Sequence, residues 1–330
     1  MSFLESLRDR ARDRPRTIVF PEGEEPRTLE AVAEIQTEGL LSPVLLGDRA
    51  RVLDGLADAG GDPDTARAVD PRITEGTGGL VAHLWNRRRA RGMSEAEARE
   101  RVRDPLFRGA LMVATGEADG SVAGAVHSTG DVLRAALWCV GPTDGIETIS
   151  SSFYMVVEEF RGRGSEVLTF TDCAVVPDPT GAQLSQIAAA AARARRSVVG
   201  DSPVVAFLSY STRGSAAGAS VQRVRKGLEL FRDMEPGIPS DGEFQGDAAL
   251  IEAVARRKAP DSAVGGDANV LVFPNLDAGN LAYKLVERLA GARAIGPVVQ
   301  GLARPCNDLS RGSSPGDIVD VACITSLMAR

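Results

Sequence analysis

The residues best suited to chemistry are concentrated in one stretch near the carboxyl terminus, residues 304–317. Within it, Ser310-Arg311-Gly312-Ser313-Ser314 brings hydroxyls, a guanidinium and glycine backbone close together in sequence. Hydroxyl, guanidinium and backbone N–H groups are the donors from which anion-binding loops are built. Asp317 follows at the start of a predicted helix, where it could cap the helix or act as a general base beside the arginine. The residue types alone leave both roles of Asp317 open.

The small number of histidines and the cysteine spacing limit the alternatives. The 330-residue chain has only two histidines, His83 and His127, and its four cysteines show no short metal-type spacing. We therefore expect neither a zinc site nor a disulfide framework, and we predict no metal. A catalytic base in this chain would be a carboxylate. The formal net charge of −7 argues against nucleic acid as a partner, although a local arginine cluster could still bind an anionic small molecule.

The hydropathy pattern indicates no membrane association. No apolar run approaches the roughly 18 residues of a membrane-spanning helix. Residues 1–13 read as a charged amphipathic helix without the apolar core of a signal peptide. We expect a cytoplasmic protein.

The elements that must hold the 304–317 stretch alternate in type. Expected strands cover residues 17–20, 43–47, 167–176, 204–212, 270–275 and 295–301, and expected helices cover 132–139, 219–232, 247–258 and 279–290. Strands alternating with helices across short turns predict an α/β protein with parallel sheets. The chain length and a change of character at Gly145 predict two domains.

The motif Arg304-Pro-Cys-Asn-Asp-Leu-Ser-Arg-Gly312, with Asp317 beyond it, resembles the carboxyl-terminal signature of phosphate acetyltransferases, or phosphotransacetylases. Further segments that resemble the same family follow in order along the chain: Phe20-Pro-Glu-Gly23, Ser128-Thr-Gly-Asp-Val-Leu-Arg134, Leu208-Ser-Tyr-Ser-Thr-Arg-Gly-Ser215 and Asp241-Gly-Glu-Phe-Gln-Gly-Asp247. On this pattern the chain is identified as a member of the phosphate acetyl/butyryltransferase family, in its short form.

The resemblance implies a fold and an assembly. We expect an α/β/α sandwich of two domains, similar to the isocitrate and isopropylmalate dehydrogenases, with the active-site cleft between the domains. The first domain would comprise residues 1–144 and 297–330, and the second residues 145–296. A homodimer is expected from the family.

The resemblance also implies a reaction: reversible transfer of an acetyl group between acetyl phosphate and coenzyme A, giving acetyl-CoA and inorganic phosphate. Coenzyme A would be a substrate, and no cofactor is predicted. By position in the motif, Asp317 would be the base that takes the thiol proton. Arg311 would hold the phosphoryl group, and Ser310 would donate a hydrogen bond to it.

Five further residues are predicted to bind substrate. Arg134 and Arg88 match arginines of the family's cleft, with Arg88 placed inside the run of arginines at 87–91. Ser128 and Thr129 form the turn that leads to Arg134. Arg27 matches a position linked to the phosphates of coenzyme A.

Three other functions are compatible with parts of this pattern. A phosphate butyryltransferase would use the same chemistry with a different acyl pocket, and an acyl-CoA-sensing domain would bind without turnover. An oxidoreductase of the related fold would need a nicotinamide fingerprint or an aspartate cluster, and the sequence has neither. The chain departs from the family pattern at Ser313, where cysteine is frequent, and at Ala135, where proline is frequent.

Overall fold

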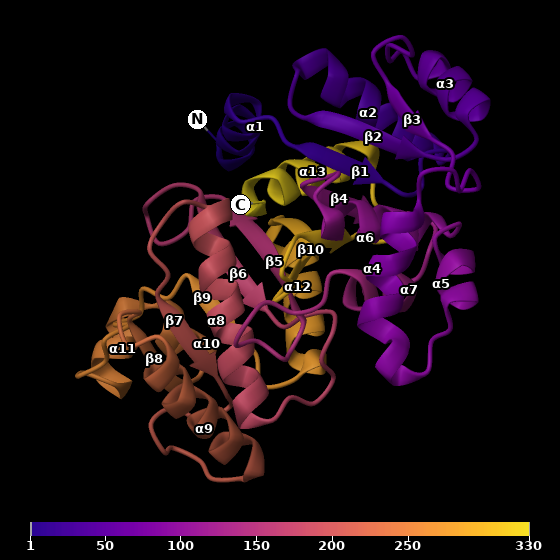
Figure 1. Cartoon of the computed structure of the whole chain (residues 1–330). Coiled ribbons are helices and arrows are strands. Elements are labelled where there is room, and N and C mark those ends of the chain that lie inside the picture. Colours follow the sequence, from indigo (N-terminus) through magenta and orange to yellow (C-terminus); the bar gives the residue numbers. More distant parts are fainter. Residues whose placement is uncertain (1, 330) are drawn as a thin grey trace. The chain divides into compact units, whose positions relative to one another are not determined.

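The computed structural model describes residues 2–329 and divides into two compact units (Figure 1). Unit 1 comprises Met1–Asp144 and Leu302–Arg330, and unit 2 comprises Gly145–Gly301. The first boundary lies where the sequence placed it. The return lies later than the predicted residue 297, because β10 (Arg293–Gln300) is still paired antiparallel with β5 (Ser150–Val157) of unit 2.

Unit 1 is built on a five-stranded parallel sheet in the order β11-β4-β1-β2-β3. Its strands are β1 (Thr17–Phe20), β2 (Ser42–Leu46), β3 (Arg67–Val69), β4 (Gly120–Ala123) and β11 (Cys306–Asp308). Its helices are α1 (Phe3–Asp13), α2 (Pro26–Glu38), α3 (Arg49–Asp58), α4 (Gly78–Arg88), α5 (Glu95–Arg101), α6 (Pro105–Thr115), α7 (Thr129–Cys139) and α13 (Pro315–Met328), with a 3₁₀ turn at Arg89–Arg91.

The helices of unit 1 cover its sheet in two groups. Helix α13 packs against α1, α2, β1 and β4, whereas α6 packs with α7 and α4 and also contacts β1 and β4. Almost every residue of α13 from Ile318 to Ser326 is buried, so its packing against the sheet fixes the segment that precedes it. The resulting layers form the predicted α/β/α sandwich.

Unit 2 carries a six-stranded sheet in the order β10-β5-β6-β9-β7-β8. The remaining strands are β6 (Glu166–Thr171), β7 (Val205–Leu208), β8 (Ser240–Phe244) and β9 (Val270–Val272). The helices are α8 (Gly181–Val198), α9 (Ala219–Met234), α10 (Gly246–Leu250), α11 (Glu252–Lys258) and α12 (Leu276–Ala290). The pairing in this sheet is mixed: β6, β9, β7 and β8 pair in parallel, whereas β5 pairs antiparallel with both β6 and β10. The predicted helix 247–258 is interrupted at Ile251, whose backbone is extended.

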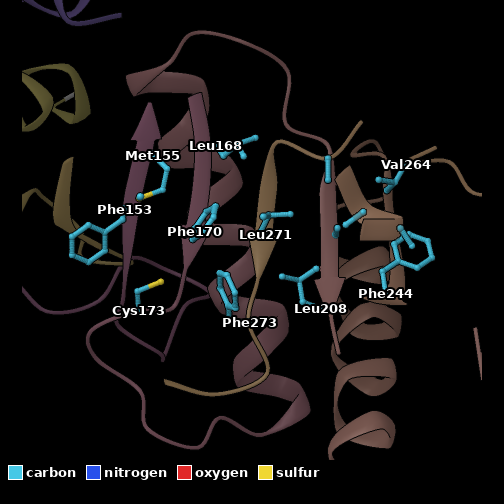
Figure 2. Packing of buried hydrophobic residues seen from close by; sticks show 14 of the residues in the cluster. Phe153, Met155, Leu168, Phe170, Cys173, Leu208, Phe244, Val264, Leu271 and Phe273 are labelled. Carbon is cyan, nitrogen blue, oxygen red and sulfur yellow. The ribbon is translucent and has the colours of Figure 1, made fainter. Parts of the chain in front are cut away.

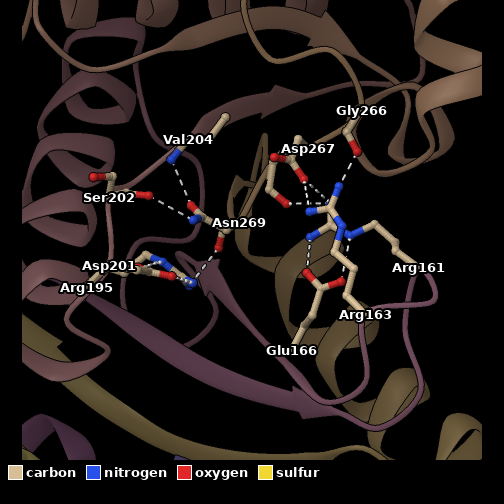
Figure 3. A network of polar contacts seen from close by, with 11 residues as sticks. Arg161, Arg163, Glu166, Arg195, Asp201, Ser202, Val204, Gly266, Asp267 and Asn269 are labelled. Atoms are coloured by element: carbon tan, nitrogen blue, oxygen red, sulfur yellow. Dashed lines mark hydrogen bonds and ion pairs between the residues drawn. The ribbon is translucent and has the colours of Figure 1, made fainter.

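Apolar side chains and saturated ion pairs stabilise unit 2. Figure 2 shows Phe170, Leu271 and Leu208 on neighbouring strands of one face of the sheet, and the rings of Phe170 and Phe273 lie 5.2 Å apart. On the polar side, Arg195 is 2% exposed and pairs with Asp201 at 2.6 Å (Figure 3). Such arginines have their donors occupied by the fold itself. Of the helices in residues 2–329, none is both long and apolar enough to cross a membrane.

Candidate active site

Three neighbouring strands of unit 1 end at one edge of its sheet. The register pairs Val19 of β1 with Ser121 of β4, and Asp308 of β11 with Ala123 of β4. The loops that leave these strands, residues 21–25, 124–128 and 309–314, therefore start side by side. In open α/β sheets this edge is where ligands bind. The predicted site residues Ser128, Ser310 and Arg311 lie on two of these loops.

Residues 309–314, named here the site loop, form a tight turn with exposed side chains. The Ser313 N–H donates to the Ser310 carbonyl at 2.9 Å, and the Gly312 N–H donates to Ser310 Oγ at 3.3 Å. Ser310 and Arg311 are exposed. Within residues 2–329 the Arg311 guanidinium makes no hydrogen bond or ion pair, so all its donors can serve an anion.

Asp317 caps α13 with one oxygen only. The sequence placed the helix start at Asp317, but α13 begins at Pro315 and Ser314 is the N-cap. Ser314 and Asp317 form a capping box: Asp317 Oδ2 accepts from the Ser314 N–H at 2.9 Å and from Ser314 Oγ at 2.8 Å. No hydrogen bond to Oδ1 is present in the described part of the chain. The two roles left open by the sequence are therefore compatible, because each can use a different oxygen.

Arg27, at the start of α2, contacts the site loop through its backbone. Its Nη1 donates to the carbonyls of Arg311 at 2.8 Å and Ser313 at 3.0 Å, and its Nη2 donates to the Ala125 carbonyl at 2.9 Å. Its Nε donates to Glu25 Oε1 at 2.6 Å. All but one of the guanidinium N–H groups are used in these contacts.

Glu22 holds the loop that follows β4. Its two oxygens accept from the backbone N–H groups of Gly124, Ala125, Val126 and His127, at distances from 2.7 to 3.0 Å. The His127 ring nitrogen Nδ1 lies 2.8 Å from Oε1. Burial alone would raise the pKa of Glu22, but the hydrogen bonds from His127 and its neighbours hold the pKa below its usual value. Glu22 therefore remains ionised to organise this loop.

Asp308 joins the end of β11 to the start of α7. It is 1% exposed, and its Oδ2 accepts the Thr129 hydroxyl proton at 2.6 Å. Its Oδ1 is buried without a partner in residues 2–329. Burial raises the pKa of Asp308 to about 6 despite the Thr129 hydrogen bond, and the charge of Glu22 acts in the same direction. The loops approach so closely that a Cβ at Gly124, where φ is 115°, would lie 2.4 Å from Asp308 Oδ1.

The hydroxyls of the Ser128-Thr129 turn are already engaged. Ser128 caps α7, since its Oγ accepts from the Asp131 N–H at 3.3 Å and donates to Asp131 Oδ2 at 2.7 Å. Arg134 is exposed and forms an ion pair with Asp131 at 2.6 Å. The N–H groups of Thr129 and Gly130 have no partner in the described residues and lie at the positive end of the helix dipole.

Arg88 stacks on α7 rather than on the site loop. Its guanidinium lies 4.2 Å from the centre of the Trp138 ring, and its Nε is buried with no partner in residues 2–329. Burial and the neighbouring arginines lower the pKa of Arg88. A cavity of about 370 Å³ is lined by Arg88, Arg91, Arg101 and Trp138 among others. Arg88 and Arg91 are thus the two arginines of the 87–91 run that line this cavity.

A second cavity in unit 1, of about 460 Å³, has a more acidic lining. It lies among the loops after β1, β2, β3 and β4 and is lined by Glu22, Glu24, Asp48 and Asp70 among others. Arg72 at its wall is bound to both Asp48 and Asp70. These carboxylates, two of which already bind Arg72, do not favour a phosphate in this cavity.

The structure joins some predicted residues and leaves others apart. Hydrogen bonds connect Thr129 to β11 and Arg27 to the backbone of Arg311. In the part of the chain described, no hydrogen bond or ion pair connects the side chain of Arg88 or Arg134 to the site loop. Their convergence on one substrate stays a prediction. Sequence reasoning gave no role to Glu22, Asp308 or Trp138, although an acid directly after a short apolar strand is a usable signal.

The cysteines and potential metal ligands offer no competing centre. All four cysteines are buried, and burial raises the pKa of each thiol, to about 11 for Cys306. A buried thiol with a raised pKa is a poor nucleophile. Across residues 2–329 there is no group of three or more His, Cys, Asp or Glu side chains that could hold a metal ion.

These features define an α/β protein with a candidate anion-binding site at the carboxyl ends of parallel strands. The sequence matches the phosphate acetyl/butaryl transferase family over residues 2–326, and the chain belongs to this family. It is 43% identical over 330 residues to a phosphate acetyltransferase of Acetivibrio thermocellus, covering 100% of this chain and 99% of that protein. A phosphotransacetylase structure from Streptococcus pyogenes matches with a TM-score of 0.92 and 38% identity, over 99% of this chain and 98% of that one.

The dehydrogenase-like fold is also found among solved structures. A protein of Salmonella typhimurium proposed to be a 4-hydroxythreonine-4-phosphate dehydrogenase matches over 96% of this chain and 99% of its own, with a TM-score of 0.56 and 11% identity. At this identity the likeness concerns the fold alone. The predicted family and the predicted α/β class are confirmed.

Proposed function

We propose that this protein catalyses the reversible transfer of an acetyl group between acetyl phosphate and coenzyme A, giving acetyl-CoA and inorganic phosphate. Similarity over the whole chain to phosphate acetyltransferases supports the activity. The observation that carries it to this site is the free Arg311 guanidinium, on the same loop-to-helix segment as the open Oδ1 of Asp317. This reaction needs two groups from the protein: a hydrogen-bond donor that binds the phosphate anion and a carboxylate that acts as base.

In the proposed mechanism, Asp317 Oδ1 takes the proton from the coenzyme A thiol, whose ordinary pKa is about 8.5. The thiolate attacks the carbonyl carbon of acetyl phosphate, so a C–S bond forms. The bond between the carbonyl carbon and the bridging oxygen then breaks, and phosphate leaves with that oxygen and the bonding electron pair. Arg311 balances the phosphate charge, and the Ser310 hydroxyl donates a hydrogen bond to its oxygens. Direct transfer is preferred to an acetyl-enzyme because every cysteine is buried.

Four of the remaining predicted residues, Arg88, Arg134, Ser128 and Thr129, are proposed to bind the anionic parts of the substrates. Arg88 and Arg134 would contact phosphates, with the arginine-lined cavity beside Trp138 available to Arg88. Because the hydroxyls of Ser128 and Thr129 are occupied, this turn would bind through the free N–H groups at the start of α7. No metal or other cofactor is proposed for the reaction.

The assembly and location follow from the family, and we propose a cytoplasmic homodimer. One exposed surface suits the dimer contact. Helix α12 presents Leu281, Leu285 and Leu289, one per turn, with exposures of 60%, 55% and 82%. A row of leucines at this spacing forms a single apolar stripe that a second copy would cover.

The activity is tested by mixing the purified protein with acetyl phosphate and coenzyme A and following thioester formation. Butyryl phosphate in a parallel reaction separates the acetyl and butyryl alternatives. We expect turnover with acetyl phosphate and a lower kcat/KM with butyryl phosphate. Binding of acetyl-CoA without turnover of either acyl phosphate would instead support an acyl-CoA-sensing domain and overturn the proposal.

A further inference from the structure

The side chain of Arg27 ties the backbone of the site loop to a neighbouring loop of unit 1. The Arg27 guanidinium accepts nothing and donates to three backbone carbonyls, those of Ala125, Arg311 and Ser313. Two of these carbonyls belong to the site loop, and the third belongs to the loop after β4. Glu25 holds the Nε of Arg27 at 2.6 Å and so fixes the plane of the fork.

The loop after β4 is itself anchored from the other side. Glu22, on the connection between β1 and α2, accepts hydrogen bonds from the N–H groups of Gly124 through His127. Glu22 therefore holds the N–H groups of one loop, and Arg27, five residues later in the first turn of α2, holds the carbonyls of two loops. A planar guanidinium can satisfy several carbonyls in a fixed geometry, which an ammonium cannot.

These contacts involve the backbone of the site loop and not its proposed reactive side chain, Arg311. Arg27 binds the carbonyl of Arg311 and not its side chain, so the Arg311 guanidinium stays open while its backbone is held. Misplacing a catalytic group by about 1 Å can cost 10²-fold in rate. A residue that fixes this backbone is therefore expected to control the rate without touching a substrate.

We propose that Arg27 is a positioning residue that holds the site loop, and that it is not a ligand for the phosphates of coenzyme A. This inference rests on the proposed function in assigning a reaction to the loop. The contacts themselves do not depend on that reaction. The two roles of Arg27 predict different kinetics, because a coenzyme A ligand matters only for thiols that carry the phosphates.

The first test compares Arg27→Gln and Arg27→Lys with wild type on three thiols: coenzyme A, dephospho-coenzyme A and pantetheine. A positioning role predicts that Arg27→Gln lowers kcat about 10²-fold with every thiol, with a smaller loss in Arg27→Lys. A phosphate-ligand role predicts a raised KM for coenzyme A, an almost unchanged kcat and no effect with pantetheine. The second pattern would overturn the inference.

Arg12→Gln is the matched control. Arg12 also donates its Nε to a backbone carbonyl, that of Glu38 at 3.0 Å, and pairs with a carboxylate, Asp9 at 2.6 Å. It does not contact the site loop. We expect this variant to keep the wild-type kcat. An equal loss of kcat in Arg12→Gln and Arg27→Gln would show a general effect on folding and would also contradict the inference.

Hydrogen exchange provides a readout that needs no activity. Arg27→Gln is expected to speed amide exchange in residues 310–314, whereas Arg12→Gln leaves exchange there unchanged. Unchanged exchange in Arg27→Gln would refute the positioning role even in an active enzyme. If wild type forms no thioester from any acyl phosphate, the proposed function fails, and the exchange experiment still decides what Arg27 holds.

Discussion

Replacing Asp308 with asparagine tests whether the fold makes a buried acid in the candidate site harder to ionise. The side chain is 1% exposed, and its Oδ2 accepts a hydrogen bond from Thr129 Oγ1 at 2.6 Å. Asparagine has nearly the same shape and can accept this hydrogen bond through its carbonyl oxygen. Asp308→Asn therefore removes the ionisation while keeping the contact.

The size of the expected change in unfolding free energy with pH follows from the raised pKa of Asp308. The pKa of Asp308 rises from 3.8 to about 6 in the folded protein. A raised folded pKa means that the contribution to stability is complete below the unfolded pKa and is lost as the pH rises through the folded pKa. The shift corresponds to about 3 kcal/mol of unfolding free energy, lost mostly between pH 3.8 and about 6.

The measurement is the free energy of unfolding by urea at several pH values across this window, for wild type and Asp308→Asn. Across this window we expect the free energy of unfolding to fall by about 2–3 kcal/mol less in the variant than in wild type. The stability of the variant relative to wild type should therefore increase as the pH rises. Parallel curves for the two proteins would refute the reasoning, because they would show that Asp308 ionises as easily in the folded chain as in the unfolded one.

Three further predictions concern the site and the assembly. Asp317→Asn should lower kcat by about 10²–10⁴-fold in the thioester assay, and a wild-type kcat would exclude Asp317 as the base. Glu22→Gln should destabilise the protein at neutral pH. Since the pKa of Glu22 is lowered, its contribution is present above the unfolded pKa of 4.5 and is lost on acidification, so urea unfolding should show the variant and wild type converging at low pH. Leu285→Asp should convert a dimer to a monomer in light scattering, while Glu287→Gln on the same helix should not; a Leu285→Asp dimer would place the interface elsewhere.

Much of the fold was predictable because its signals are local. Apolar runs bounded by turn residues predicted β1, β2 and β9, and the domain boundary before Gly145 followed from the change in pattern. The failures also have physical causes. Strand β11 was missed because Asn307 and Asp308 are polar, and they are buried only through partners such as Thr325 Oγ1, 2.8 Å from Asn307 Nδ2. Whether β5 and β10 run antiparallel depends on pairing between distant segments, which periodicity does not report.

The motif predicts the members of the candidate site, and their roles stay predictions, but it does not give the contacts that each member makes. The sequence identifies Arg311 and Asp317, but it cannot show that Ser314 takes the cap position or that Asp317 uses only one oxygen for it. It also cannot show that Arg27 binds carbonyls, since backbone direction is fixed only in the folded chain. The role of an acid such as Glu22 is equally hidden, because all four of its backbone donors lie about a hundred residues away in sequence.

The positive charge of this chain comes almost entirely from arginine, so the residue type says little about which arginine binds a ligand. Whether the N–H groups of an arginine already have partners in the fold is more informative. Arg161, Arg195 and Arg27 are bound by carboxylates or carbonyls of the fold, and each is thereby assigned to structure. Arg311 is different, since its backbone is held while its guanidinium has no partner in residues 2–329. An unpaired guanidinium on an otherwise fixed loop lacks the stabilising ion pairs and hydrogen bonds that Arg161, Arg195 and Arg27 make. An anion that binds there recovers this energy, and that is the physical reason to place the phosphate of the substrate at Arg311.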